Sequence, residues 1–163
     1  MRTEEMVGSL KHLTALHEEL LAISEKKTEC IKTSDMDCLS KLLMQERKQL
    51  QAVEQAEEER QQIAESIFAE NGKPETERTV SELLHCIENA EQRKRLDEAA
   101  AGLIEKLVAL KQKERLNNDL IQQSMQFVQL SLDMLQPAAK NMNYTDKNIK
   151  QQTMNRSVFD SKA

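Results

Sequence analysis

The apolar positions of the chain recur at helical spacing through its longest uninterrupted stretch, residues 96–135. This stretch contains no proline and one glycine, Gly102, so no residue in it forces a break. Steps of three and four residues place the apolar side chains on one face of a helix. The pattern therefore predicts a helix of about 40 residues, roughly 60 Å long. Its apolar face passes through the polar Glu114 and Asn117 and consists of Leu96, Ala100, Leu103, Leu107, Leu110, Ile121, Met125, Val128, Leu132 and Leu135.

A second apolar face starts only in the later half of this predicted helix, roughly 140° around the axis from the first. It consists of Leu116, Leu120, Phe127, Leu130 and Met134, whereas the same side of the earlier half is mostly polar. The chain's own helices can cover the first face. The second face requires either another internal helix or a partner protein, and the sequence leaves both interpretations open.

Two long helices are predicted before this stretch. Residues 3–33 form the first, with Lys27 standing within its apolar stripe. Residues 35–71 form the second, with Ser34 as N-cap, and the short turn between them indicates an antiparallel pair. Polar residues interrupt the apolar face of the second helix, and they either fix its register or face water: Glu46, Glu57 and Arg60.

A break and a short helix are predicted next. Gly72 suits the left-handed position after a helix end, and Pro74 cannot continue the helix. The sequence Thr79-Val80-Ser81-Glu82 is a capping box that opens a third helix over residues 79–89. Its apolar positions are out of phase with those that follow, which predicts a bend near residues 89–93. The fourth helix then covers residues 94–136 and ends before Pro137.

The composition fits only one fold class. Aromatic residues make up 2% of the chain, and it holds three Gly and two Pro, too few turn and strand residues for a sheet protein. We therefore expect an all-α fold, an elongated antiparallel bundle of three long helices plus one short helix in residues 1–136. Residues 137–163 are polar and show no period, so we expect a disordered, flexible C-terminal tail.

Charge and cysteine content indicate the compartment and exclude some partners. Residues 1–136 carry a net charge of −8, which argues against nucleic acid or an anionic membrane as the main partner. The longest purely apolar runs, such as residues 20–23, are too short to span a bilayer, and the N-terminus lacks the apolar core of a signal peptide. We therefore expect a cytoplasmic protein whose Cys30, Cys38 and Cys86 are reduced.

No residue pattern in the sequence indicates catalysis, a metal site or a cofactor. His12 and His17 lie on different sides of a helix, and His17-Glu18-Glu19 lacks the second histidine of a zinc-protease motif. The pair Glu82 and His85 has no counterpart of the kind that a di-metal helix bundle requires. We expect a protein that is not an enzyme.

The ordered layout of the chain resembles that of the FlgN family of flagellar type III export chaperones. The resemblance runs over nearly the whole chain. In the first two helices, it rests on a basic end of the first helix (Lys26, Lys27, Lys32), an acidic turn before Leu39, and a second helix with Glu46 and the run Glu57-Glu58-Glu59-Arg60. In the last helix, it rests on the sequence Leu116-Asn117-Asn118-Asp119-Leu120-Ile121. After that helix, it rests on a spaced tyrosine and the closing Phe159-Asp160-Ser161-Lys162-Ala163.

The resemblance implies a cytoplasmic chaperone that binds the C-terminal amphipathic helices of hook–filament junction proteins. Such a chaperone prevents their premature assembly and delivers them to the export gate. We expect the late apolar turns to bind this cargo through Leu116, Leu120, Ile121, Phe127, Leu130 and Met134. By family analogy, Tyr144 and Phe159 in the tail would dock at the export gate. The alternative is a coiled-coil structural adaptor that self-associates through the same late face, and a homodimer is left open.

Overall fold

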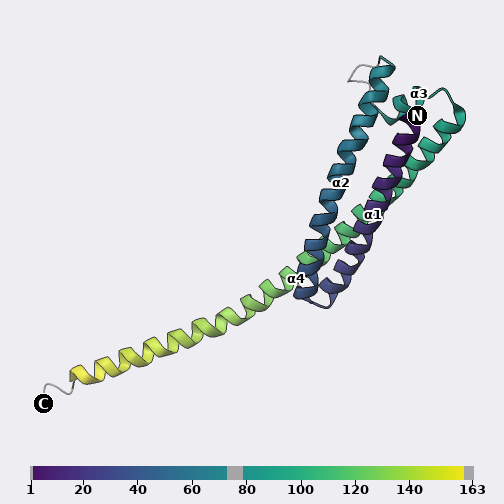
Figure 1. The fold of residues 1–163 in the computed structure, drawn as a ribbon. Coiled ribbons are helices and arrows are strands. Elements are labelled where there is room, and N and C mark those ends of the chain that lie inside the picture. The colour runs from purple at the N-terminus through teal and green to yellow at the C-terminus, as the bar shows by residue number, and fades with distance from the viewer. Residues whose placement is uncertain (1, 73–78, 160–163) are drawn as a thin grey trace. The chain divides into compact units, whose positions relative to one another are not determined.

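The structure, a computed structural model, describes residues 2–72 and 79–159, with side chains described in residues 2–72 and 79–136 (Figure 1). These residues form four helices and no strand: α1 (Arg2–Lys32), α2 (Met36–Glu70), α3 (Val80–His85) and α4 (Ala90–Phe159). The predicted all-α fold class, with three long helices and one short helix, is confirmed. The fold divides into two compact units, Met1–Leu120 and Ile121–Ala163, and each is described by itself below.

The first unit begins with an antiparallel pair of helices, α1 and α2 (Figure 1). Arg2 at the start of α1 lies 3.0 Å from Glu70 at the end of α2. Half-way along, the Gln49 side-chain amide donates a hydrogen bond to the backbone carbonyl of Leu16 at 3.2 Å. The two helices therefore lie side by side over their full length, as the short turn between them predicted.

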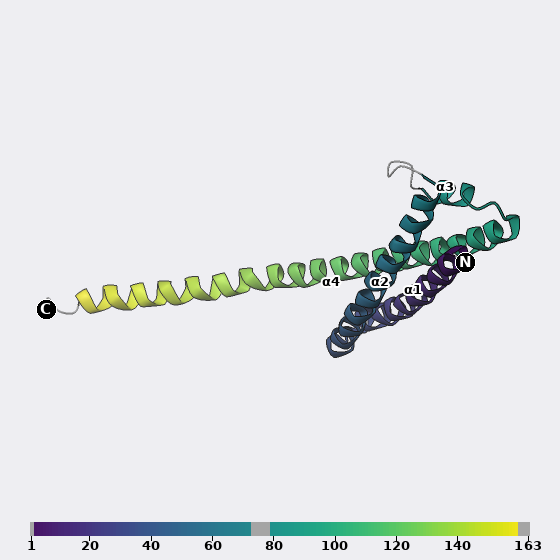
Figure 2. The ribbon, with the colours of Figure 1, turned by 45° about the horizontal axis from the view of Figure 1, so that its top comes forward.

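The first turns of α4 run parallel to α1. Arg95 lies 3.3 Å from Glu4, and Lys106 lies 3.1 Å from Glu18, so residue numbers rise together along both helices. This direction follows from α3, which connects the end of α2 to the start of α4 at the same end of the unit (Figure 2). Within this unit, α4 is consequently antiparallel to α2.

The turn between α1 and α2 closes on paired backbone hydrogen bonds. Asp35 N donates to Cys30 O at 2.9 Å, and Ser34 N donates to Ile31 O at 3.2 Å, the two bonds of a Schellman helix end. Ser34 takes the left-handed position with φ of 56°. The N-cap is therefore Asp35, whose carboxylate accepts from Cys38 N at 2.9 Å, and the prediction of Ser34 as N-cap is wrong by one residue. Ser34 cannot cap α2 because it already terminates α1.

The connections around α3 follow their capping residues. Gly72, with φ of 64°, takes the left-handed position after α2, and the Thr79 side chain accepts a hydrogen bond from Glu82 N, as predicted. The helix that was expected over residues 79–89 ends at His85. Asn89 then accepts from the amides of residues 91 and 92, so α4 begins at Ala90 rather than at residue 94.

The predicted end of the last helix at Pro137 is wrong for the backbone, because α4 continues to Phe159. Proline lacks one backbone N–H and clashes with the preceding turn, at a cost of about 3 kcal/mol. It removes one intrahelical hydrogen bond, and the peptide groups on both sides keep theirs. Pro137 therefore carries a local cost, which predicts a stop, without ending the helix.

Two clusters of buried apolar side chains hold the first unit together. The larger joins all four helices and consists of Met6, Val7, Leu10, Ile67, Phe68, Leu83, Ile87, Leu96 and Ala99. The smaller joins α1 and α2 through Leu13, Leu16 and Ala56, with Leu103 of α4 packed against it. Both lie in the half of the unit that contains α3, so apolar packing is densest there.

Two glycine substitutions should change stability in opposite directions. Gly72→Ala should lower the free energy of unfolding by about 1 kcal/mol, because a side chain is strained at its φ of 64°. Gly102→Ala should raise it by about 0.5–1 kcal/mol, because a Cβ there meets nothing within 4 Å and alanine favours a helix interior. Chemical denaturation of both variants tests this. Changes of the same sign in the two free energies of unfolding would contradict it.

The cysteines differ from their predicted state. Cys30 near the end of α1 and Cys38 in the first turn of α2 are joined in a disulfide, with their Cα atoms 5.9 Å apart. Cys86 is free and half-buried. The expectation of three reduced cysteines therefore fails for this pair. Composition alone could not show that the tight turn brings Cys30 and Cys38 together.

Candidate functional site

A buried ammonium group links the three long helices of the first unit. Lys27 of α1 has 7% of its side chain exposed, and its Nζ lies 2.6 Å from Glu46 Oε1 of α2. The same atom lies 2.8 Å from Glu114 Oε1 of α4. One cation is thus shared by two carboxylates from different helices. A charge in this position fixes the register of both partners, because sliding either helix would leave the lysine unpaired.

Next to this cation, three neutral polar side chains form a hydrogen-bonded group. Asn117 of α4 is 2% exposed, and its amide donates to Ser24 O at 3.0 Å and to Ser24 Oγ at 3.1 Å. The Thr28 hydroxyl donates to Asn117 Oδ1 at 2.6 Å. Together with Lys27, Glu46 and Glu114, these residues are called the polar layer below.

The protonation of Lys27 follows from two opposing effects. Burial by itself lowers the pKa of this ammonium group, but hydrogen bonds and attraction from Glu114 and Glu46 outweigh it, so the pKa is raised above 10.5. Lys27 is therefore charged at neutral pH. The stability that the charged Lys27 contributes is fully present below the ordinary lysine pKa of 10.5, and it is lost as the pH rises through the raised pKa.

A second ion pair lies along α2. Arg60 donates to Glu57 from Nε at 2.8 Å and from Nη2 at 2.7 Å, a two-pronged contact between residues three apart. This hydrogen bonding outweighs burial and lowers the pKa of Glu57, while it raises the pKa of Arg60. Of the three polar interruptions in α2, Glu46 thus binds a buried partner, and Glu57 and Arg60 bind each other at the edge of the helix.

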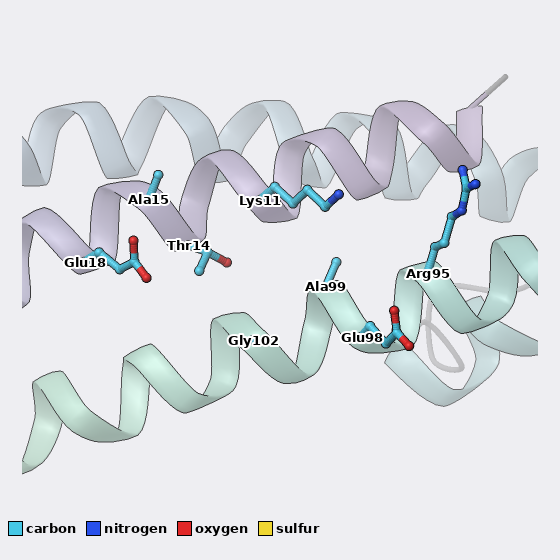
Figure 3. A pocket seen from close by; sticks show the side chains of 8 residues that line it. All are labelled: Lys11, Thr14, Ala15, Glu18, Arg95, Glu98, Ala99 and Gly102. Carbon is cyan, nitrogen blue, oxygen red and sulfur yellow. The ribbon is translucent and has the colours of Figure 1, made fainter.

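The hollow between α1 and α4 of the first unit has a volume of about 330 Å³ (Figure 3). Its lining combines small side chains with charges of both signs: Lys11, Thr14, Ala15, Glu18, Arg95, Glu98, Ala99 and Gly102. The charged groups at its ends already have partners, since Glu18 pairs with Lys106 and Arg95 pairs with Glu4 and Glu91. Glu98 pairs with Lys94 at 3.8 Å, so three of the four charged residues that line the hollow are already in ion pairs.

The second unit carries the two most exposed large apolar side chains among the described residues. Phe127 is 72% exposed and Met134 is 73% exposed, in contrast to 1% for Leu96 in the core. Residues 121–136, called the apolar segment below, contain one charged residue, Asp133, and five glutamines. Its exposed large apolar side chains are Ile121, Met125, Phe127, Val128, Leu130, Leu132, Met134 and Leu135.

The exposed side chains of the apolar segment lie on two faces of the helix. Phe127, Leu130 and Met134 belong to the face for which the sequence left a partner open. Met125, Val128 and Leu132 belong to the first face, which the chain's own helices were expected to cover. That expectation is wrong beyond residue 120. The stripe of α4 is buried at Leu96 and Asn117, is 41% exposed at Leu107 between them, and is exposed at each of its apolar positions from Ile121 onward.

The remaining predicted site residues lie elsewhere. In the first unit, Leu116 is 42% exposed, and Leu120 is half-buried. Tyr144 and Phe159 lie outside the residues whose side chains the structure describes, so their proposed docking role stays a prediction. Among the described residues, no group of three or more His, Cys, Asp or Glu side chains is placed to hold a metal ion. None of the described helices is long and apolar enough to cross a bilayer.

Comparison with known proteins decides the family. The sequence model of the FlgN protein family matches residues 1–151. The chain belongs to the FlgN family. It is also 33% identical to the uncharacterized protein YvyG of Bacillus subtilis (strain 168), over an alignment of 168 residues that covers 100% of both chains. No solved structure matches. Membership of the FlgN family supports a general role as a flagellar export chaperone and confirms the resemblance seen in the sequence.

The polar layer is the part of this FlgN-family fold that sequence reasoning missed. The sequence marked Lys27, Glu46, Glu114 and Asn117 as polar interruptions of apolar stripes, but it assigned them no common partners. A usable signal was present, because a lysine and two glutamates that interrupt three different stripes can satisfy one another. Ser24 and Thr28 gave no such signal, since neither stands on the predicted stripe of its helix.

Proposed function

We propose that the protein is a cytoplasmic export chaperone whose apolar segment binds the C-terminal amphipathic helices of flagellar hook–filament junction proteins. The observation that carries the proposal is the exposure of eight large apolar side chains on residues 121–136. A monomeric soluble protein rarely exposes such a continuous apolar surface without a partner. FlgN family membership supports an export client as that partner.

The chemistry of the segment suits an amphipathic helix as its client. A helix that lays its apolar stripe along another helix is recognised through side chains at steps of three and four. Phe127, Leu130 and Met134 provide such a row. These three apolar side chains, at about 1.5–3 kcal/mol each, supply roughly 4.5–9 kcal/mol of gross binding energy. Association and ordering costs reduce this sum, which leaves a complex that can dissociate at the export gate without ATP.

Binding of a peptide tests this proposal. Isothermal titration of the full chain with the C-terminal segment of a hook–filament junction protein should give a dissociation constant of about 10 μM or lower. The N-terminal segment of the same junction protein is the control and should not bind. Equal binding of both segments would contradict recognition of a specific client helix.

For the tail, we propose delivery of the client to the export gate through Tyr144 and Phe159. A chain that ends at residue 136 should keep its affinity for the client segment and lose client secretion in a flagellated host. The double variant Tyr144→Ala, Phe159→Ala of the full chain should show the same separation of binding from secretion. Loss of client binding in either protein would contradict this division of roles.

A self-associating coiled-coil adaptor is the second candidate function. The sequence predicts that such an adaptor would self-associate through the late face around Phe127, Leu130 and Met134. The first face of the segment also favours it, because its apolar residues alternate at steps of four and three as in a two-stranded coiled coil: Ile121, Met125, Val128, Leu132 and Leu135. Light scattering after size exclusion separates the candidates. A homodimer that persists when the client segment is added supports the adaptor, and a one-to-one complex supports the chaperone.

A further inference from the structure

Cys30 and Cys38 differ in their access to solvent. Cys38 is half-buried in the first turn of α2, while Cys30, near the end of α1, is only 4% exposed. Their Cα atoms are 5.9 Å apart, within the range that a disulfide requires. Cys38 is therefore the cysteine of the pair that a small thiol or disulfide from solution can approach more readily.

The backbone holds the two cysteines together independently of the bond between them. Asp35 N donates to Cys30 O at 2.9 Å, and the Asp35 carboxylate accepts from Cys38 N, also at 2.9 Å. One residue of the turn thus binds both cysteines through its own groups. Opening the disulfide leaves these hydrogen bonds in place, so the thiols remain next to each other and can close again.

The position of the pair connects it to the polar layer. Cys30 follows Lys27 by three residues and Thr28 by two, and these residues bind Glu114 and Asn117 of α4. Cys38 precedes Glu46, the second carboxylate partner of Lys27, by two helical turns. A covalent bond across this turn therefore restrains the end of the first unit at which α1 contacts α4 through the polar layer. This end lies in the half of the unit with less apolar packing.

We propose that Cys30 and Cys38 form a reversible thiol–disulfide site, in which Cys38 reacts with a low-molecular-weight disulfide and Cys30 resolves the product. In the first step, the Cys38 thiolate attacks the small disulfide, forms a mixed disulfide and releases one small thiol. In the second step, the Cys30 thiolate attacks the Cys38 sulfur and releases the other small thiol. The protein loses two electrons and two protons, and the small disulfide gains them.

The reversibility of the site rests on the proposed cytoplasmic location, where disulfides are usually transient and respond to redox conditions. A bond that closes a short loop restrains the unfolded chain only moderately. We expect the oxidised protein to melt about 5–10 °C above the reduced protein. The oxidised state should also slow hydrogen exchange in residues 24–46.

The test uses the full chain with Cys86→Ser, which removes the remaining free thiol. In glutathione buffers, the number of alkylatable thiols in this protein should fall from two to none as the fraction of oxidised glutathione rises. The two thiols should reappear when reduced glutathione is restored. Adding Cys30→Ser should trap one glutathione on Cys38. Adding Cys38→Ser should leave Cys30 unmodified, and circular dichroism checks that each variant is folded.

Three results would overturn the proposal. They are a bond that does not form or does not reopen, equal glutathione adducts in the two single-cysteine variants, and a melting temperature that is the same in both redox states. None of these readouts involves a client. Failure of the redox site is therefore distinguishable from failure of the proposed chaperone function, which would be a loss of client binding in both redox states.

Discussion

Phe127→Asp should weaken client binding by about 100-fold or more while leaving the helical content of the protein unchanged. Phe127 is 72% exposed, so its replacement removes almost no contact within the chain. In a complex, the same substitution deletes a large aromatic anchor and places a carboxylate in an apolar contact, a loss of about 3 kcal/mol or more. Titration calorimetry measures the affinity, and circular dichroism measures the helicity.

A matched control lies on the polar side of the same segment. Gln122, at about 100° per residue, lies on the polar side between the two apolar faces. Gln122→Asp adds the same charge, and it should change the affinity by less than about 3-fold. Equal losses in the two variants would indicate a general effect of charge. A collapse of helicity in Phe127→Asp would show that the residue is structural.

Lys27→Met should destabilise the first unit by about 2–4 kcal/mol, because it leaves Glu46 and Glu114 facing each other without a counter-charge. The melting temperature should fall by roughly 10 °C. Methionine fills nearly the volume of the lysine stem, so a cavity contributes little. Thermal and chemical denaturation at neutral pH provide the measurement.

The rescue variant separates charge from packing. Lys27→Met combined with Glu46→Gln and Glu114→Gln removes all three charges and should recover most of the lost stability. A triple variant as unstable as Lys27→Met would show that the packing of the lysine stem, and not the ion pairs, stabilises this position. A Lys27→Met variant as stable as the natural chain would show that the polar layer fixes register without contributing stability.

Periodicity predicted the helices of this protein because their apolar residues fall on consistent faces. Leu96 and Met6 were expected in a core, and both are buried there. Caps were less certain, because several polar residues compete for one position. Ser34 and Asp35 are both good caps, and the choice depends on how α1 ends, which is a property of the pair of helices.

The candidate site was predictable in part. The second apolar face around Phe127 and Leu130 stood out in the sequence because it starts only in the later half of the helix, and whether an internal helix or a partner covers it was left open. The exposure of Met125 and Val128 was not predictable, because they continue a stripe that is buried at Leu96 and Asn117. Spacing shows which residues share a face, but it does not show where along a helix its neighbours stop covering that face.

Hydrogen exchange with and without the client segment tests the central claim most directly, since it reports where along the chain the client binds. We expect saturating client to slow amide exchange by at least 10-fold in residues 121–136. Exchange in the exposed part of α2, residues 36–50, should stay unchanged. Protection confined to α1 and α2, with residues 121–136 exchanging as in the free protein, would contradict the assignment of the apolar segment as the client-binding surface.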